Sequence, residues 1–496
     1  MSASNCIIIK YMKYNEYKQL NLTRIGEEVR YYWEENETFE KGQKLSEGHP
    51  SFVFYDGPPS ANGKPGIHHV MARTIKDVFC RYKAQKGYFV DRKAGWDTHG
   101  LPVELGVEKS LGITKEDIGK KISVDKYNQA CRTEVLKYKD LWDELTRVMG
   151  YWVDLKEPYI TFNNEYIETL WFLLKKLYDK GLLYKGYTIQ PYSPAAGTGL
   201  SSHELNMPGC YRDVKDTTCV AMFKMKDESG KLKDVFGMEL STFNCQLSTY
   251  AIAWTTTPWT LPSNTALCVG PNIDYVLLET THPYTGQPCR IIMAKALVNS
   301  MFPEGKSPEY KVLGESKGTA LEGLQYEQLI PWAKPKEVSD KGSFRIILGD
   351  YVTTEDGTGI VHIAPTFGAD DARVAKKAGI GELLLFDRDG KQMPMVDKQG
   401  RFAPIEELNP DWVKANMNTE LYSQYAGKFV KNAYDPSKSE KDMSLDVELV
   451  IMLKGEGKLF KSEKHTHSYP HCWRTDKPVL YYPLDSWFIR TTALKE

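Results

Sequence analysis

The chain has 496 residues, of which 41% are hydrophobic and 26% charged, and its 64 Lys and Arg balance 65 Asp and Glu. A formal net charge of −1 excludes attraction of a polyanion by the global field, so a nucleic acid would need a local basic surface. Nine scattered cysteines without a C-x-x-C pair argue against a disulfide scaffold or zinc ribbon, and favour reduced thiols in a cytoplasmic protein. The three consecutive isoleucines near the start are too few for a signal peptide or a membrane span.

The first 50 residues predict a helical extension, because Ile25, Val29, Tyr32 and Trp33 can share one helical face. From residue 51 a strand, "SFVFY", leads through the breaker-rich loop "DGPPSANGKPG" into a helix that ends near Gly87. Along this helix runs a stripe formed by Val70, Thr74, Ile75, Val78, Phe79 and Tyr82. A strand, a glycine-rich loop and a helix make the first unit of a nucleotide-binding α/β domain, predicted over 51–204.

A second strand and loop lie in "GYFVDRKAGWDTHGLPVE", and residues 105–185 predict several helices. Over 205–433 the residue pattern changes to short runs of β-branched and aromatic residues: "TTCVAMFKM", "TYAIAWTTTPWTLP", "TALCVG", "DYVLLE", "RIIMAKA", "FRIILGDYV" and "GTGIVHIAP". These runs predict a β-rich domain inserted after the helical segment. Residues 434–496 are expected to hold a solvated linker, "YDPSKSEKD", and a final mixed segment.

Two adjacent histidines, His68 and His69, stand at the start of the first helix after the loop. A helix start exposes unpaired backbone N–H groups and a positive dipole end, which suits a phosphate group. The histidines can therefore be phosphate donors, metal ligands or ordinary helix-start residues. No acidic or cysteine partner lies nearby at ligand spacing, which disfavours zinc.

The strings "DGPPSANGKPGIHHVMARTIKD" and "GWDTHGLPVE" together resemble the catalytic signature of the class I aminoacyl-tRNA synthetases, in the spelling of the isoleucine members. The resemblance covers nearly all the chain from about residue 20. It implies an incomplete Rossmann-type catalytic domain that is interrupted by a β-rich editing domain and whose second half begins within residues 434–496. It implies activation of isoleucine by ATP with Mg²⁺ and transfer to tRNA(Ile). The residues implied for amino-acid and ATP binding are Gly57, Pro58, Pro59, Asn62, Asp97 and Trp487, with His68 and His69 as catalytic donors.

The chain departs from the family at its His-x-Gly-His motif, which reads Gly-Ile-His-His here. Gly66 stands where the family has its first histidine, and His68 stands where it has glycine. His69 matches the last histidine. We expect the imidazole of His68 to turn into the space left free at Gly66 and still reach phosphate.

Two further strings, "AWTTTPWTLPSNTA" and "GTGIVHIAPTFGADDARVA", lie about a hundred residues apart. Taken alone they can be a Thr-rich edge strand and an unrelated turn. As one site, threonine hydroxyls can hold a ribose, an ester carbonyl and a water, while a carboxylate anchors an α-ammonium group. Both strings resemble the editing site of the family, which implies roles for Thr255, Thr257, Thr260, Asn264, His362 and Asp371.

Editing is needed because isoleucine and valine differ by only one methylene, which limits how well one binding pocket can distinguish them. A pocket separates them by only about 1–3 kcal/mol, a range established on this same class of synthetase. A second site is then needed to hydrolyse valine wrongly attached to tRNA(Ile). Neither string offers metal ligands, so we expect water activation by hydroxyls and by the substrate itself.

No structural zinc is expected, because Cys472 is the only cysteine in "QPYSPAAGTGLSSHE" and "SYPHCWRTDKPVL", where many relatives carry pairs. The family's Lys-Met-Ser-Lys-Ser loop and anticodon-binding domain are not found, so the chain is expected to be an N-terminal fragment, a monomer with little activation activity. Three alternatives stay open: a valyl- or leucyl-type synthetase, a non-catalytic tRNA-binding module, and a metal-dependent hydrolase built on the histidines.

Overall fold

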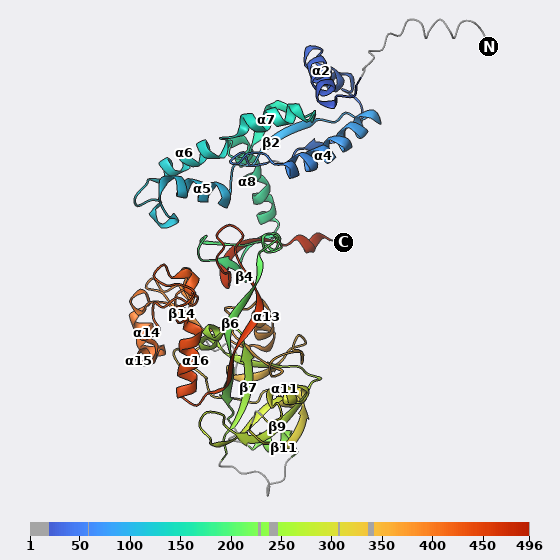
Figure 1. Ribbon diagram of the computed structural model, residues 1–496. Helices are drawn as coiled ribbons and strands as arrows, with labels where there is room; N and C mark the ends of the chain where they lie inside the picture. The colour runs from blue at the N-terminus through green and yellow to red at the C-terminus, as the bar shows by residue number, and fades with distance from the viewer. Residues whose placement is uncertain are drawn as a thin grey trace, which may run out of the picture. The chain divides into compact units, whose positions relative to one another are not determined.

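The computed structural model describes residues 19–495, except 58, 227–229, 238–246, 306–307 and 336–341. The chain divides into two compact units (Figure 1). The first runs to Leu183 and takes in the last residues of the chain, and the second is Tyr184–Arg490. Pro58 lies outside the described residues, so its role in binding stays a prediction.

The first unit is built on a parallel sheet with the order β1-β2-β3, formed by Phe54–Tyr55, Arg92–Trp96 and Asp154–Ile160. Helix α4 (Ile67–Gln85) connects β1 to β2. The predicted succession of strand, glycine-rich loop, helix and second strand is therefore confirmed.

The other helices of this unit are α2 (Leu22–Glu35), α3 (Thr38–Leu45), α5 (Leu101–Leu111), α6 (Val124–Val135), α7 (Lys139–Val148) and α8 (Asn164–Asp179). The helical prediction over 105–185 holds except at β3, which it missed. Pro158 within β3 cannot donate a helical hydrogen bond, and it marks the place where a helix is disfavoured.

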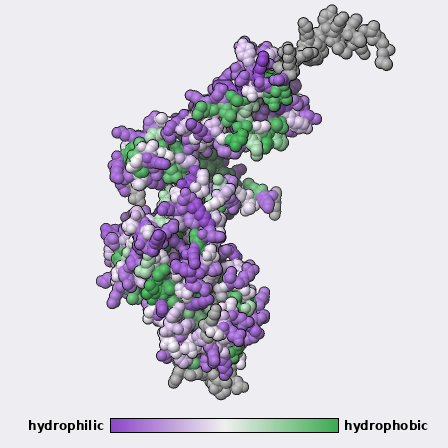
Figure 2. Space-filling view, viewed as in Figure 1, coloured by the Kyte–Doolittle hydropathy of each residue, from purple (hydrophilic) through white to green (hydrophobic). Residues whose placement is uncertain are grey.

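The apolar stripe of α4 is exposed, although its periodicity alone would place it in a core. Ile75, Val78, Phe79 and Tyr82 keep 55%, 59%, 62% and 55% of their surface accessible. Figure 2 shows hydrophobic side chains gathered over the part of this unit that carries α4. The residues that α4 buries are Arg73 and Cys80.

The second unit contains a six-stranded sheet with the order β11-β9-β10-β7-β6-β16 and a three-stranded sheet β12-β8-β13. Its smaller sheets are β14-β15 and β17-β4-β5. The strand bounds are β4 Leu183–Ser193, β5 Thr198–Gly199, β6 Tyr211–Lys224, β7 Thr249–Thr255, β8 Ala266–Val269, β9 Asp274–Thr281, β10 Pro288–Ala294, β11 Tyr310–Lys317, β12 Arg345–Leu348, β13 Ile360–Ile363, β14 Leu384–Phe386, β15 Gln392–Pro394, β16 Leu459–Pro470 and β17 Leu480–Ile489.

Each of the seven runs predicted to be β-type overlaps one of these strands, so the prediction of strands in these runs is confirmed. Their β-branched and aromatic side chains fill a core in which Leu267, Tyr275, Ile292 and Ile346 are fully buried. The long strand β16 pairs antiparallel with β6 over nearly its whole length. Residues after 458 therefore complete the same sheet that β6 begins.

Short helices cover this unit: α9 Ser202–Leu205, α10 Lys231–Val235, α11 Val298–Met301, α12 Gly318–Leu321, α13 Ala369–Ala378, α14 Pro410–Asn416, α15 Thr419–Tyr422 and α16 Leu445–Gly455. A 3-10 helix, η2 (Pro258–Ser263), follows β7 and carries half of the Thr-rich string. Within the described ranges, no helix combines the length and apolar composition that a membrane span requires.

Candidate functional site

The start of α4 is capped by its own histidine. The imidazole Nδ1 of His69 accepts a hydrogen bond from the backbone N–H of Gly66 at 2.9 Å. The neutral ring must then carry its proton on Nε2, where it can donate. Burial, and then the charges of His68 and Arg73, lower the pKa of His69, so the ring is a neutral donor near pH 7.

His68 occupies the space that a side chain at position 66 would take. A Cβ built on Gly66 would lie 2.9 Å from Cε1 and 3.0 Å from Nδ1 of His68. The ring also packs on that of His69, with centroids 3.8 Å apart. The imidazole therefore turns toward Gly66, as the exchanged motif predicts, while its reach to a phosphate group stays a prediction.

A cavity of about 410 Å³ lies beside this helix start. Four of the predicted binding residues line it: Gly57, Pro59, Asn62 and His69. Arg73, Lys76 and Trp142 also line it, and sequence reasoning missed them. The signal for Arg73 and Lys76 was present, because positions 69, 73 and 76 recur at helical spacing on one face of α4, whereas no local pattern indicates Trp142, which lies on α7.

Two of the three cationic residues that line this cavity share one carboxylate, and the third is Lys64. Lys76 Nζ lies 2.8 Å from Oδ1 of the buried Asp56, and Arg73 Nη2 lies 3.8 Å from its Oδ2. Only 6% of the Arg73 side chain is exposed, and its Nε and Nη1 atoms have no hydrogen-bond partner among the described residues. Two cations against one anion leave the cavity wall with a net positive charge.

The remaining residues predicted for the catalytic site lie outside this cavity lining. The backbone N–H of Asp97 donates to the carbonyl of Pro59 at 3.0 Å, which ties the end of β2 to the loop. The Asp97 carboxylate accepts from the N–H of His99 at 3.3 Å. Trp487 lies on β17 of the second unit, where 59% of its surface is exposed.

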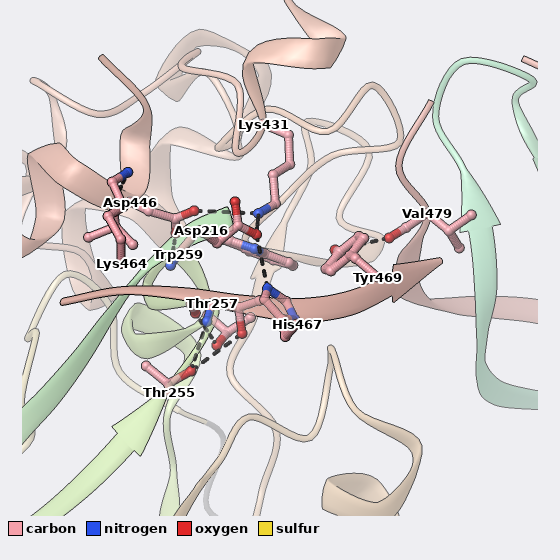
Figure 3. Close-up of polar contacts among 12 residues, drawn as sticks. Asp216, Thr255, Thr257, Trp259, Lys431, Asp446, Lys464, His467, Tyr469 and Val479 are labelled. Carbon is pink, nitrogen blue, oxygen red and sulfur yellow. Dashed lines mark hydrogen bonds and ion pairs between the residues drawn. The ribbon is translucent and has the colours of Figure 1, made fainter. Parts of the chain in front are cut away.

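The Thr-rich string forms a tight turn between β7 and η2 (Figure 3). The N–H of Thr257 donates to Oγ1 of Thr255 at 3.1 Å, and the two hydroxyl oxygens are 3.4 Å apart. The hydroxyl of Thr260 donates to the carbonyl of Thr257 at 2.9 Å. The turn therefore gathers three hydroxyl groups within one short segment.

His362 joins this turn from the second string, 102 residues away in sequence. Its Nε2 lies 3.2 Å from Oγ1 of Thr260. Because that hydroxyl already donates to Thr257, we assign the imidazole proton to Nε2 and leave Nδ1 as an acceptor. Burial lowers the pKa of His362 to about 4, so the ring is neutral at physiological pH.

The antiparallel pairing of β8 with β13 brings the two strings together, with His362 opposite Leu267. Asn264 is buried, its Nδ2 donates to the carbonyl of Ala266 at 2.8 Å, and its Oδ1 accepts from the Tyr326 hydroxyl at 2.8 Å. These bonds make Asn264 a support of the site.

Asp371 lies in the first turn of α13, just after β13. Its Oδ2 accepts from the N–H of Ala364 at 2.9 Å. Burial raises the pKa of this carboxyl group to about 7 and outweighs that hydrogen bond. A carboxyl group held close to half-ionised responds strongly to a cation, such as an α-ammonium group, brought beside it.

Across the described part of the chain, no three His, Cys, Asp or Glu side chains cluster closely enough to hold a metal ion.

Residues 28–496 match the profile of a family described as tRNA synthetases class I (I, L, M and V). The chain belongs to this family. The resemblance inferred from the two catalytic strings is thereby confirmed.

Among curated class I synthetases, the isoleucine–tRNA ligase of Bacteroides fragilis is 63% identical over 98% of this chain and 42% of its own length. That of Porphyromonas gingivalis is 61% identical with the same coverage, and that of Clostridium tetani is 42% identical over 96% of this chain. The chain spans about two fifths of the length of these relatives. A leucyl-tRNA synthetase editing domain from P. falciparum, 12% identical, covers 50% of this chain and 99% of its own with a TM-score of 0.31, too low to define the fold.

The stability of this synthetase chain is expected to depend on pH through Asp371. With a folded pKa near 7 against about 3.8 unfolded, the unfolded state loses its proton first as pH rises. The free energy of unfolding should therefore fall between pH 4 and 7, by roughly 2 kcal/mol after allowance for partial exposure. Urea unfolding of the parent and of Asp371→Asn at pH 4 and pH 8 measures this. A parent that loses no more stability than the variant between the two pH values would contradict the assignment.

Proposed function

We propose that the chain is part of an isoleucyl-tRNA synthetase, which activates isoleucine with ATP, transfers it to tRNA(Ile) and hydrolyses mischarged valyl-tRNA(Ile). The observations that support the editing half are the contact of Thr260 with His362 on β13, which pairs with β8, and the hydrogen bond that holds Asp371 to Ala364 just after β13. The similarity to isoleucine–tRNA ligases supports the choice of isoleucine over valine or leucine.

The first unit would serve as the start of a Rossmann-type nucleotide site. The N-terminus of α4 and the Nε2–H of His69 would donate to phosphate oxygens as charge develops during adenylate formation. Lys76 and Arg73 would balance the remaining phosphate charge, which arrives with Mg²⁺ as part of the ATP substrate. Asn62 would contact the nucleotide, and Asp97 the α-ammonium group of isoleucine.

Gly57 and Pro59 would line the amino-acid and ATP pockets on the loop before α4, together with Pro58. Trp487 would line the amino-acid pocket, and His68 would supply the second phosphate donor. These roles come from the family motif, with the cavity lining as support for Gly57 and Pro59.

In the editing reaction, a water molecule would attack the ester carbonyl carbon of valyl-tRNA(Ile). The carbon–oxygen bond to the terminal ribose breaks, and the ribose hydroxyl leaves with a proton. Thr255 and Thr257 would hold the ribose, the carbonyl and the water by hydrogen bonds. Asp371 would pair with the α-ammonium group, and a compact β-domain pocket would exclude the larger isoleucyl group.

The nucleotide half is tested by comparing ATP with adenosine in binding to the 496-residue chain. Replacing Lys76 with methionine should weaken ATP binding roughly tenfold and leave adenosine binding unchanged, because only ATP carries the charge that Lys76 would balance. Titration calorimetry measures both affinities.

Lys83→Met is the matched control, since Lys83 lies on the same helix over the rings of Phe52 and Tyr88. Equal weakening of both ligands by the Lys76 variant would mean that the cavity had collapsed. Unchanged ATP affinity would remove Lys76 from the phosphate site. A parent chain that binds neither ligand would argue against the nucleotide site itself.

A further inference from the structure

A buried carboxylate from a distant helix holds the Thr-rich turn. Oδ1 of Asp446, in the first turn of α16, accepts a hydrogen bond from the backbone N–H of Trp259 at 2.9 Å (Figure 3). Trp259 lies in the first turn of η2, where amides have no partner within the helix. Asp446 lies outside η2 and therefore supplies the N-terminal cap that the sequence of η2 lacks.

This carboxylate needs a partner of its own, because only 3% of the Asp446 side chain is exposed. Lys431 Nζ lies 3.5 Å from Oδ2 of Asp446. Burial raises the pKa of Asp446 to about 6, and the positive charge of Lys431 opposes that rise. Lys431 thus favours the ionised form, whose hydrogen bond to Trp259 is the stronger one.

Lys431 is fixed in turn from the opposite side. Its Nζ lies 2.9 Å from Oδ2 of Asp216 on β6, and only 11% of its side chain is exposed. Nε2 of His467 on β16 lies 3.3 Å from the same Asp216 oxygen, and the Lys431 ammonium stands 5.1 Å from the ring centre of Tyr469. The ammonium group therefore has little freedom to leave Asp446.

The turn that this network holds is the one that carries the hydroxyls of the editing site. Thr257 immediately precedes η2, and Thr260 lies one residue beyond Trp259. Thr260 is within 3.2 Å of the His362 imidazole. A shift of the Trp259 backbone would displace both hydroxyls relative to His362.

We propose that Asp446, held by Lys431 and Asp216, is the positioning residue that sets the Thr255–Thr260 turn for ester hydrolysis. Asp446 acts through the Trp259 amide and does not touch the substrate. The proposal rests on the editing activity proposed above. It also makes a statement about the turn that can be measured without any substrate.

The first experiment is hydrogen exchange of the Trp259 amide in the 496-residue chain. Asp446→Ala should speed exchange at least about tenfold, because the external acceptor is gone. Asp446→Asn keeps an oxygen that can accept, and it should restore much of the protection. Glu448→Ala is the matched control, because Glu448 is a second lysine-paired carboxylate on α16 and pairs with Lys428.

The second experiment follows deacylation of valyl-tRNA(Ile) by the same variants. Asp446→Ala should lower kcat about tenfold with little change in KM, Asp446→Asn should recover part of that loss, and Glu448→Ala should match the parent. If Asp446 had only a structural role, its replacement would lower the melting temperature without lowering kcat at a nearly constant KM.

Parent-like exchange at Trp259 in Asp446→Ala would overturn the positioning role, even if deacylation fell. Equal loss of kcat in Glu448→Ala would overturn it too. If Asp446→Ala does not fold, Lys431→Met takes its place, because it removes the cation that favours the ionised form of Asp446. Parent-like kcat and parent-like exchange at Trp259 in Lys431→Met would then overturn the proposal. A parent chain that does not deacylate valyl-tRNA(Ile) would reject the proposed editing function and its dependence on Asp446. This result is distinct from parent-like exchange at Trp259 in Asp446→Ala, which rejects only the positioning role.

Discussion

Replacing Asp371 with asparagine is expected to lower kcat/KM for deacylation of valyl-tRNA(Ile) by 10- to 100-fold. A charge-assisted hydrogen bond to the α-ammonium group contributes about 1.5–3 kcal/mol, and asparagine removes the charge. Asparagine still offers an oxygen to the N–H of Ala364, so the start of α13 should keep its structure. Steady-state deacylation with valyl-tRNA(Ile) measures the effect.

Asp370→Asn is the control for this prediction. Asp370 neighbours Asp371 in the same helical turn, is 65% exposed and pairs with Arg373 at the surface. It should deacylate at the parent rate. Similar losses in both variants would point to the helix start as a whole, and a parent-like rate in Asp371→Asn would contradict the ammonium-binding role.

Replacing Trp142 with alanine is expected to destabilise the first unit by about 3–5 kcal/mol and to abolish nucleotide binding there. The indole is 2% exposed and packs with Ala61 and Trp96. Its N–H donates to the carbonyl of Gly63 at 2.9 Å, and its ring lies 4.6 Å from that of His69. The same side chain therefore holds the loop and one wall of the cavity.

Urea unfolding and ATP titration measure the two effects of the Trp142 change. Trp142→Phe separates them, since phenylalanine keeps much of the packing but cannot donate to Gly63. Trp171→Ala is the control, because Trp171 is 66% exposed on α8. A Trp142→Ala chain that unfolds within 1 kcal/mol of the parent would contradict the packing argument.

Short residue patterns predicted much of the fold, because they reflect the conformational preferences of neighbouring residues. The β-branched runs of the second unit all form strands, and the loop before α4 ends where its glycines and prolines indicate. The pattern failed at β3, a strand between helical segments, where pairing with β2 decides the conformation. The stripe of α4 was predicted as part of a helix, but its exposure was not, since periodicity shows that a helix has an apolar face but not what covers it.

The sequence indicates some residues of the two sites and not others. The family strings point to His69, Thr257, His362 and Asp371, and the roles of these residues stay predictions. Arg73 and Lys76 follow His69 at helical spacing, so a closer reading of α4 could have found them. The bond from Asp446 to Trp259 joins residues 187 positions apart, and no local pattern indicates such a contact.

The most direct test of the account compares two esters in one assay with the 496-residue chain. Hydrolysis of valyl-tRNA(Ile) should be roughly 10- to 100-fold faster than hydrolysis of isoleucyl-tRNA(Ile), because the proposed editing pocket would reject the extra methylene. Equal rates for the two esters, or no hydrolysis of the valyl ester, would contradict an editing site built from the Thr-rich turn, His362 and Asp371.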